Sequence, residues 1–130
     1  MHDQPTTTEL IGAVEDFIRN VAMNQLEGHA QFHARVAANA LAIVKRELEL
    51  GSGQASGELD RLENLLGLDG DLDALNRELC RRIREHELDL DDERLVAHLW
   101  QSTLDKVAVD QPRYSGYQQA VDQRESSPPG

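Results

Sequence analysis

The chain has 130 residues, which is enough for one domain with a single hydrophobic core. Its formal net charge of −11 disfavours nucleic acid and anionic membranes as partners, because binding phosphate requires clustered Lys and Arg side chains. Only 4% of the residues are aromatic, so Leu, Val, Ile and Ala must build the core, and this composition favours helices.

The sequence carries no mark of a compartment other than the cytoplasm. Cys80 is the single cysteine, which excludes an intrachain disulfide. No stretch approaches the ~18 apolar residues of a membrane-spanning helix, and the first residues lack the basic and apolar regions of a signal peptide. We therefore expect a cytoplasmic protein.

The first helix is predicted to begin near Thr6–Thr8 and to fade around residues 24–28. Thr6 and Glu9 match a capping box, which would satisfy two amides at the start of the helix. Apolar residues then recur every three or four positions and give the helix one apolar face: Leu10, Ile11, Val14, Phe17, Ile18 and Val21.

A second helix is predicted over residues 29–50. Gly51 and Gly53 are expected to stop it and to open a polar, glycine-rich loop over residues 51–57. A short helix follows over residues 58–66, and Gly67 closes it. At ~1.5 Å per residue the second helix would span roughly 30 Å and would be the longest element of the domain.

Two more helices are predicted, over residues 71–87 and 91–110. Aspartates open both, at the positive end of the helix dipole, and Pro112 ends the second one. Residues 116–130 contain almost no core-forming side chains, so we expect a flexible tail there. The sequence thus predicts an all-α fold: an antiparallel bundle of four main helices plus one short helix, in a single domain of residues 1–115.

Short motifs for a metal or a catalytic site are weak. His29 and His33 lie one turn apart, but no third ligand has a fixed spacing from them. The aspartates of residues 69–73 begin like a calcium loop, yet Ala74 and Cys80 stand where Gly and Glu are required. We expect no metal, no cofactor and a core position for Cys80. Enzymatic activity is disfavoured but left open.

Six polar side chains form the main candidate binding site. His33, Arg35 and Asn39 interrupt the second helix; Asn76 interrupts the fourth, and Lys106 and Asp110 lie near the end of the last one. Burying such groups costs roughly 1–3 kcal/mol each unless they find hydrogen-bond partners. If the helices bring them together, they would bind an anion or the backbone of a partner. The alternative is an internal hydrogen-bond network that fixes helix register.

Three segments carry a resemblance to a known family: residues 32–41 (FHARVAANAL), 75–83 (LNRELCRRI) and 104–114 (LDKVAVDQPRY). Over Glu9–Tyr114 the chain resembles an uncharacterised bacterial domain family without established activity. Members tend to be encoded beside aminoglycoside-phosphotransferase-like proteins and acyl-CoA dehydrogenases. The resemblance implies an accessory subunit in acyl-CoA or small-molecule kinase metabolism.

These observations lead to three hypotheses. The first is a non-catalytic accessory or binding module that acts with a protein partner, which the resemblance suggests is a phosphotransferase-like kinase. The second is a small-molecule binder or enzyme in which Lys106 or Arg35 holds an anionic group. The third is a structural homodimer, with Trp100 as the anchor of an exposed apolar patch.

Overall fold

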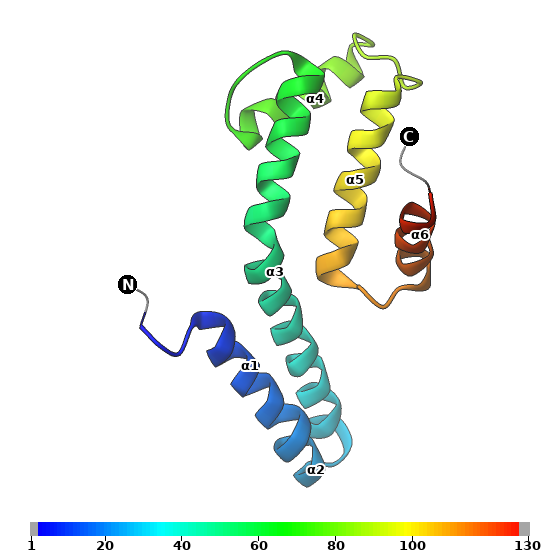
Figure 1. Cartoon of the computed structure of the whole chain (residues 1–130). Helices are drawn as coiled ribbons and strands as arrows, with labels where there is room; N and C mark the ends of the chain where they lie inside the picture. Colours follow the sequence, from blue (N-terminus) through cyan, green and yellow to red (C-terminus); the bar gives the residue numbers. More distant parts are fainter. Residues whose placement is uncertain (1–2, 128–130) are drawn as a thin grey trace. The chain divides into compact units, whose positions relative to one another are not determined.

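The computed structural model describes residues 3–127, and every regular element within them is helical (Figure 1). The all-α class predicted from the sequence is therefore confirmed. In chain order the elements are α1 (Thr7–Phe17), the π-helical η1 (Ile18–Ala22), α2 (Met23–Gln25), α3 (Gly28–Leu66), α4 (Leu72–Arg84), α5 (Glu93–Asp110) and α6 (Ser115–Ser126). The contacts divide the chain into two compact units, Met1–Gly51 and Ser52–Gly130, where the sequence predicts a single domain over residues 1–115.

The first helix begins as predicted. The amide of Glu9 donates to Thr6 Oγ1 (3.2 Å) and the amide of Thr6 donates to Glu9 Oε2 (3.1 Å), which completes the capping box. The helix continues through η1 and α2 and ends at Leu26, whose backbone is extended. Its predicted start and end both agree with the structure.

The N-terminal unit is a hairpin of two helices, in which the first part of α3 runs back beside α1 (Figure 1). The Lys45 ammonium lies over Gly12, where a Cβ would be only 3.6 Å from Nζ. Farther along, Arg19 Nη2 donates to Asn39 Oδ1 (2.9 Å). Ala38 is the one fully buried residue among residues 3–51, so a small side chain sits where the two helices approach.

The glycine-rich loop and the separate short helix predicted for residues 51–66 are wrong, because α3 continues through both to Leu66. Each glycine in a helix interior costs about 1 kcal/mol relative to alanine, so local propensity alone favours a break. Tertiary contacts outweigh this cost. Gln54 Nε2 donates to the carbonyl oxygen of Asp105 (2.9 Å), and Leu62 enters the core of the C-terminal unit. The helix does end before Gly67, whose φ is +67°.

The core of the C-terminal unit is made of leucines from three helices: Leu62, Leu65 and Leu66 of α3, Leu75 and Leu79 of α4, and Leu95 of α5. The last part of α3 and α5 run antiparallel, as predicted for neighbouring helices, since Gln54 contacts Asp105 and Arg61 contacts His98. The aspartate caps are also confirmed. Asp71 and Asp92 accept the amides of Ala74 and Arg94, each at 2.8 Å.

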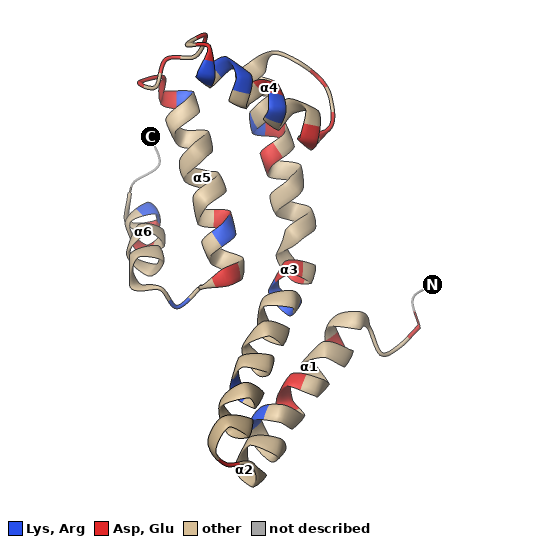
Figure 2. Cartoon of the chain, turned by 180° about the vertical axis from the view of Figure 1, so that it is seen from behind, with Lys and Arg blue, Asp and Glu red and all other residues tan. Residues whose placement is uncertain are grey.

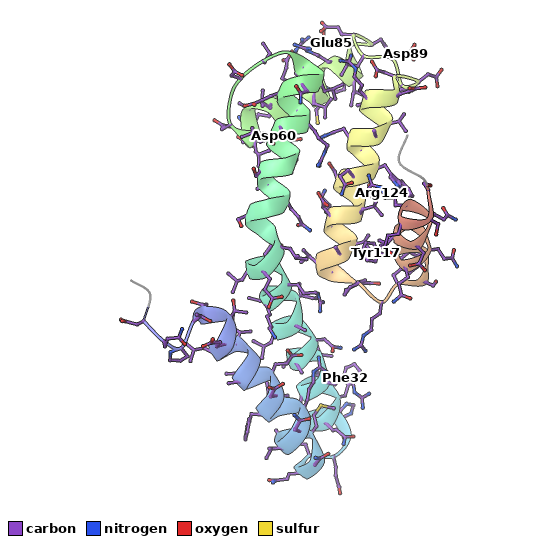
Figure 3. All side chains as sticks on the ribbon, in the orientation of Figure 1. Phe32, Asp60, Glu85, Asp89, Tyr117 and Arg124 are labelled. Carbon is purple, nitrogen blue, oxygen red and sulfur yellow. The ribbon has the colours of Figure 1, made fainter. Side chains whose placement is uncertain are left out.

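Most of the segment predicted as a flexible tail, residues 116–130, is helical, because Ser115–Ser126 form α6. No residue of α6 is buried, which explains why the sequence shows no core pattern there. A polar contact joins it to α5 instead: the Arg124 guanidinium donates to the side-chain oxygen of Gln101 (Figure 3). Residues 128–130 lie outside the described part of the chain.

None of the helices between residues 3 and 127 combines the length and apolar character needed to cross a bilayer.

Candidate functional site

Three of the six predicted site residues lie on the surface of the N-terminal hairpin. His33, Arg35 and Asn39 are all exposed. The edge of the His33 ring meets the Phe32 ring, with centroids 5.6 Å apart, and Asn39 accepts the hydrogen bond from Arg19. In a hairpin of two helices each helix covers only one face of its neighbour, so polar residues on the other faces stay exposed.

The other three lie in the C-terminal unit. Asn76 is half-buried and donates to Glu58 Oε1 (2.9 Å), which ties α4 to α3. Lys106 and Asp110 are exposed near the end of α5, and none of the ion pairs among residues 3–127 joins them. The bonds of Asn39 and Asn76 are those expected of an internal network within each unit. That all six residues form one binding site stays a hypothesis.

A second polar group lies between α3 and α5 of the C-terminal unit, and sequence reasoning missed it. We call Arg61, His98, Ser102 and Asp105 the Arg61 cluster. His98 is only 3% exposed, and its Nδ1 accepts a long hydrogen bond from Arg61 Nε (3.4 Å). Arg61 Nη2 lies 3.6 Å from Asp105 Oδ2. The available signal was the spacing of the three α5 residues at i, i+4 and i+7, which puts them on one helical face.

The electrostatics of this cluster favour the neutral form of His98. Burial lowers the pKa of His98, and the positive charge of Arg61 lowers it further, while Glu58 opposes the shift. Because Nδ1 accepts from Arg61, the imidazole proton belongs on Nε2. Arg61 Nη2 and Ser102 Oγ are buried and have no hydrogen-bond partner in the structure. The cluster therefore retains donor capacity beside a neutral histidine.

A network of ion pairs holds the end of α4. Arg81 pairs with Glu78 (2.8 Å) and Glu87 (2.9 Å), and Arg82 pairs with Glu78 (2.8 Å). Hydrogen bonds from Arg81 and then Arg82 lower the pKa of Glu78 to about 2. Arg82 also donates to the carbonyl oxygen of Leu66 at the end of α3 (3.1 Å). Arg82, one of the arginines that gather on α4 (Figure 2), thus fastens α4 to the end of α3.

Cys80 does not pack in the core as predicted; it is exposed. It follows Leu79 by one residue, and a step of one residue turns a helix by ~100° away from the buried stripe. Among residues 3–127 no three side chains of His, Cys, Asp or Glu come together as metal ligands.

Comparison with known proteins gives one match. Residues 24–114 match the model of a family described as "Domain of unknown function (DUF6285)". The chain belongs to this family. No curated protein and no solved structure matches the chain. The matched segment begins in α2, later than the Glu9 predicted from the resemblance, and it contains the whole Arg61 cluster.

Proposed function

We propose that this chain is a non-catalytic binding module that acts with a partner protein. The observation that carries the proposal is an exposed apolar patch on α5. Val96, Leu99 and Trp100 are 51%, 45% and 53% exposed, and all three lie within little more than one turn. Helical periodicity places them away from the face of His98 and Asp105 that lies against α3. Exposed tryptophans flanked by aliphatic side chains are common anchors of protein interfaces.

The polar side chains of the same unit support a binding role over a catalytic one. Arg61 bonds to His98, Asn76 bonds to Glu58, and Gln54 bonds to the backbone of Asp105. Bonds of this kind between neighbouring helices fix their register, which is the internal network that the sequence left open as an alternative. A fixed register holds the α5 patch in one shape for a partner.

The partner that we propose is a phosphotransferase-like kinase of acyl-CoA or small-molecule metabolism, as the family resemblance suggests. The test is to co-express the tagged chain with such kinases from the same genome and to measure stoichiometric complexes by size-exclusion chromatography. We expect a complex that Trp100→Glu weakens at least tenfold. Leu90→Glu is the control, because Leu90 is exposed but precedes α5. A complex insensitive to Trp100→Glu, or no complex with any of the kinases, contradicts the proposal.

One observation favours a second candidate, the binding of a small anionic ligand. Arg61 Nη2 and Ser102 Oγ are buried without hydrogen-bond partners. Both groups can donate a hydrogen bond to an anion. Inorganic phosphate and coenzyme A are the probes, with thermal unfolding as the measurement. A ligand-dependent rise in Tm that Arg61→Gln removes would favour this function. Equal Tm with and without both probes would exclude it for these two ligands.

A further inference from the structure

One buried leucine of α5 lies outside the leucine core of the C-terminal unit. Leu104 is only 7% exposed, yet it is not among the buried residues that form this core. Its neighbour Asp105 lies on the side of α5 that meets α3, where it pairs with Arg61. One residue turns a helix by ~100°, so the Leu104 side of α5 is turned away from α3. Another element therefore covers Leu104.

The element on this side of α5 is α6. It runs back beside α5 after the turn of residues 111–114 (Figure 1). Near its other end, the Arg124 guanidinium donates to the side-chain oxygen of Gln101, one turn before Leu104 (Figure 3). Gln101, Leu104 and Ala108 share one face of α5 because their spacing is i, i+3 and i+7. With one anchor at each end, α6 lies over this face.

A row of half-buried residues on α6 matches this face. Tyr117, Ala120 and Val121 are half-buried, and they share a helical face with Arg124. None of them is fully buried, and α6 adds no residue to the leucine core. Release of α6 therefore uncovers Leu104 and leaves that core intact.

The start of α6 is packed more closely than its end. The Tyr114 ring lies against Gly116, where a Cβ would be 2.7 Å from Tyr114 Cε1. The far end is held through Arg124, which is exposed. A helix of 12 residues is marginal in water by itself, and no side-chain hydrogen bond caps its first turn. These features are those of a strap that is hinged at residues 111–114 and opens from its Arg124 end.

The residue under this strap continues the α5 patch. Val96, Trp100 and Leu104 follow one another at intervals of four residues, so they form one stripe along α5. Val96 and Trp100 are exposed, whereas Leu104 is covered. The family match over residues 24–114 contains the whole stripe and ends one residue before α6.

We propose that α6 is a hinged strap that regulates the α5 patch. While α6 is closed, Leu104 is masked and the stripe ends at Trp100. When α6 opens, Leu104 joins Val96 and Trp100, and a partner can dock along about two turns of the helix rather than one. This inference rests on the proposed binding function of the patch, but the opening of α6 is measured without a partner.

The first experiment measures how fast a thiol reagent labels position 104 in the full chain. With Cys80→Ser and Leu104→Cys combined, labelling should be at least tenfold slower than that of the exposed Cys80 in the natural chain. Adding Arg124→Ala should raise the rate at least threefold. Gln119→Ala, at an exposed position of α6, is the control and should leave the rate unchanged. Circular dichroism verifies that the variants stay helical.

Urea separates the opening of α6 from the unfolding of the whole unit. Opening one polar helix exposes little surface, so the labelling rate should depend little on urea below the unfolding transition. A rate that rises steeply with urea in this range overturns the proposal, because Leu104 would then be uncovered only by unfolding. Labelling as fast as that of Cys80 overturns it too, since α6 would cover nothing.

A second measurement leaves Leu104 in place. The natural chain and Arg124→Ala are titrated with the apolar dye anilinonaphthalene sulfonate. Arg124→Ala should bind the dye at least threefold more tightly, and adding Trp100→Glu should remove the gain because it interrupts the stripe. Equal dye binding by Arg124→Ala and the natural chain contradicts the proposal.

Kinase binding distinguishes this inference from the proposed function. A kinase complex should form at least threefold more tightly with Arg124→Ala than with the natural chain. Equal affinity, in a complex that Trp100→Glu weakens, supports the function and overturns regulation by α6. If no kinase binds any variant while labelling and dye binding respond as expected, the proposed function is wrong and the strap is supported.

Discussion

Arg61 Nε on α3 donates to Nδ1 of His98 on α5, so a charged guanidinium and a buried imidazole share one hydrogen bond inside the C-terminal unit. The bond requires a neutral histidine. Protonation would place two positive charges side by side, with Asp105 and Glu58 as the nearest compensating carboxylates.

The first prediction is that stability falls as pH drops below about 6.5, the usual pKa of histidine. The pKa of His98 is lowered in the folded chain, so the unfolded state binds more protons in this range. The contribution of neutral His98 to stability is therefore fully present above its pKa in the unfolded chain, and it is lost as pH falls toward its lower pKa in the folded chain. Urea unfolding at pH 8 and pH 5.5 measures it. His98→Leu should flatten the profile between these values, whereas His33→Leu, at an exposed position, should not.

The second prediction concerns Glu78 at lower pH. Its pKa falls from the usual 4.5 to about 2 through hydrogen bonds from Arg81 and Arg82. Its stabilising effect is present above pH 4.5 and disappears as pH falls toward 2. Glu78→Gln should make the unfolding midpoint less dependent on pH across this range. Asp73→Asn is the control, since its ion pair with Arg77 is 74–80% exposed, and an equal effect would contradict the prediction.

The third prediction contrasts Gly53, which lies inside α3, with Gly67, which follows the last residue of α3. Gly53 is exposed within the helix, and a Cβ there meets nothing within 4 Å. Gly53→Ala should therefore raise the free energy of unfolding by about 0.5–1 kcal/mol. Gly67 has a φ of +67°, so Gly67→Ala should lower it by roughly 1–2 kcal/mol. Urea titration measures both. Destabilisation by Gly53→Ala would show that the glycine-rich segment is not a helix in solution.

The fourth prediction tests how α6 is held. No residue of α6 is buried, and the hydrogen bond from Arg124 to Gln101 links α6 to α5 through side chains. Arg124→Ala should speed hydrogen exchange of the amides in residues 115–126 and leave α5 unchanged. Gln119→Ala, at an exposed position of the same helix, is the control. Unchanged exchange in Arg124→Ala would mean that other contacts hold the helix.

The sequence by itself determined the helical class and the starts of α1, α3, α4 and α5 to within two residues. Side-chain caps such as Thr6 and Asp71 act within one turn, and a leucine stripe follows from the helical period, so neighbouring residues contain this information. The contacts of the candidate site residues were harder to predict from the sequence. Asn39 and Asn76 were singled out as polar groups within apolar patterns, but their hydrogen-bond partners Arg19 and Glu58 could not be named.

Only the tertiary structure decided the course of residues 51–57, the Arg61 cluster and α6. Each depends on contacts between residues far apart in the chain: Gln54 with Asp105, Arg61 with His98, and Gln101 with Arg124. Local propensities differ by about 1 kcal/mol at most positions, and a few such contacts exceed that difference. Glycines that favour a break therefore lie inside a helix, and a polar tail without a core pattern is helical.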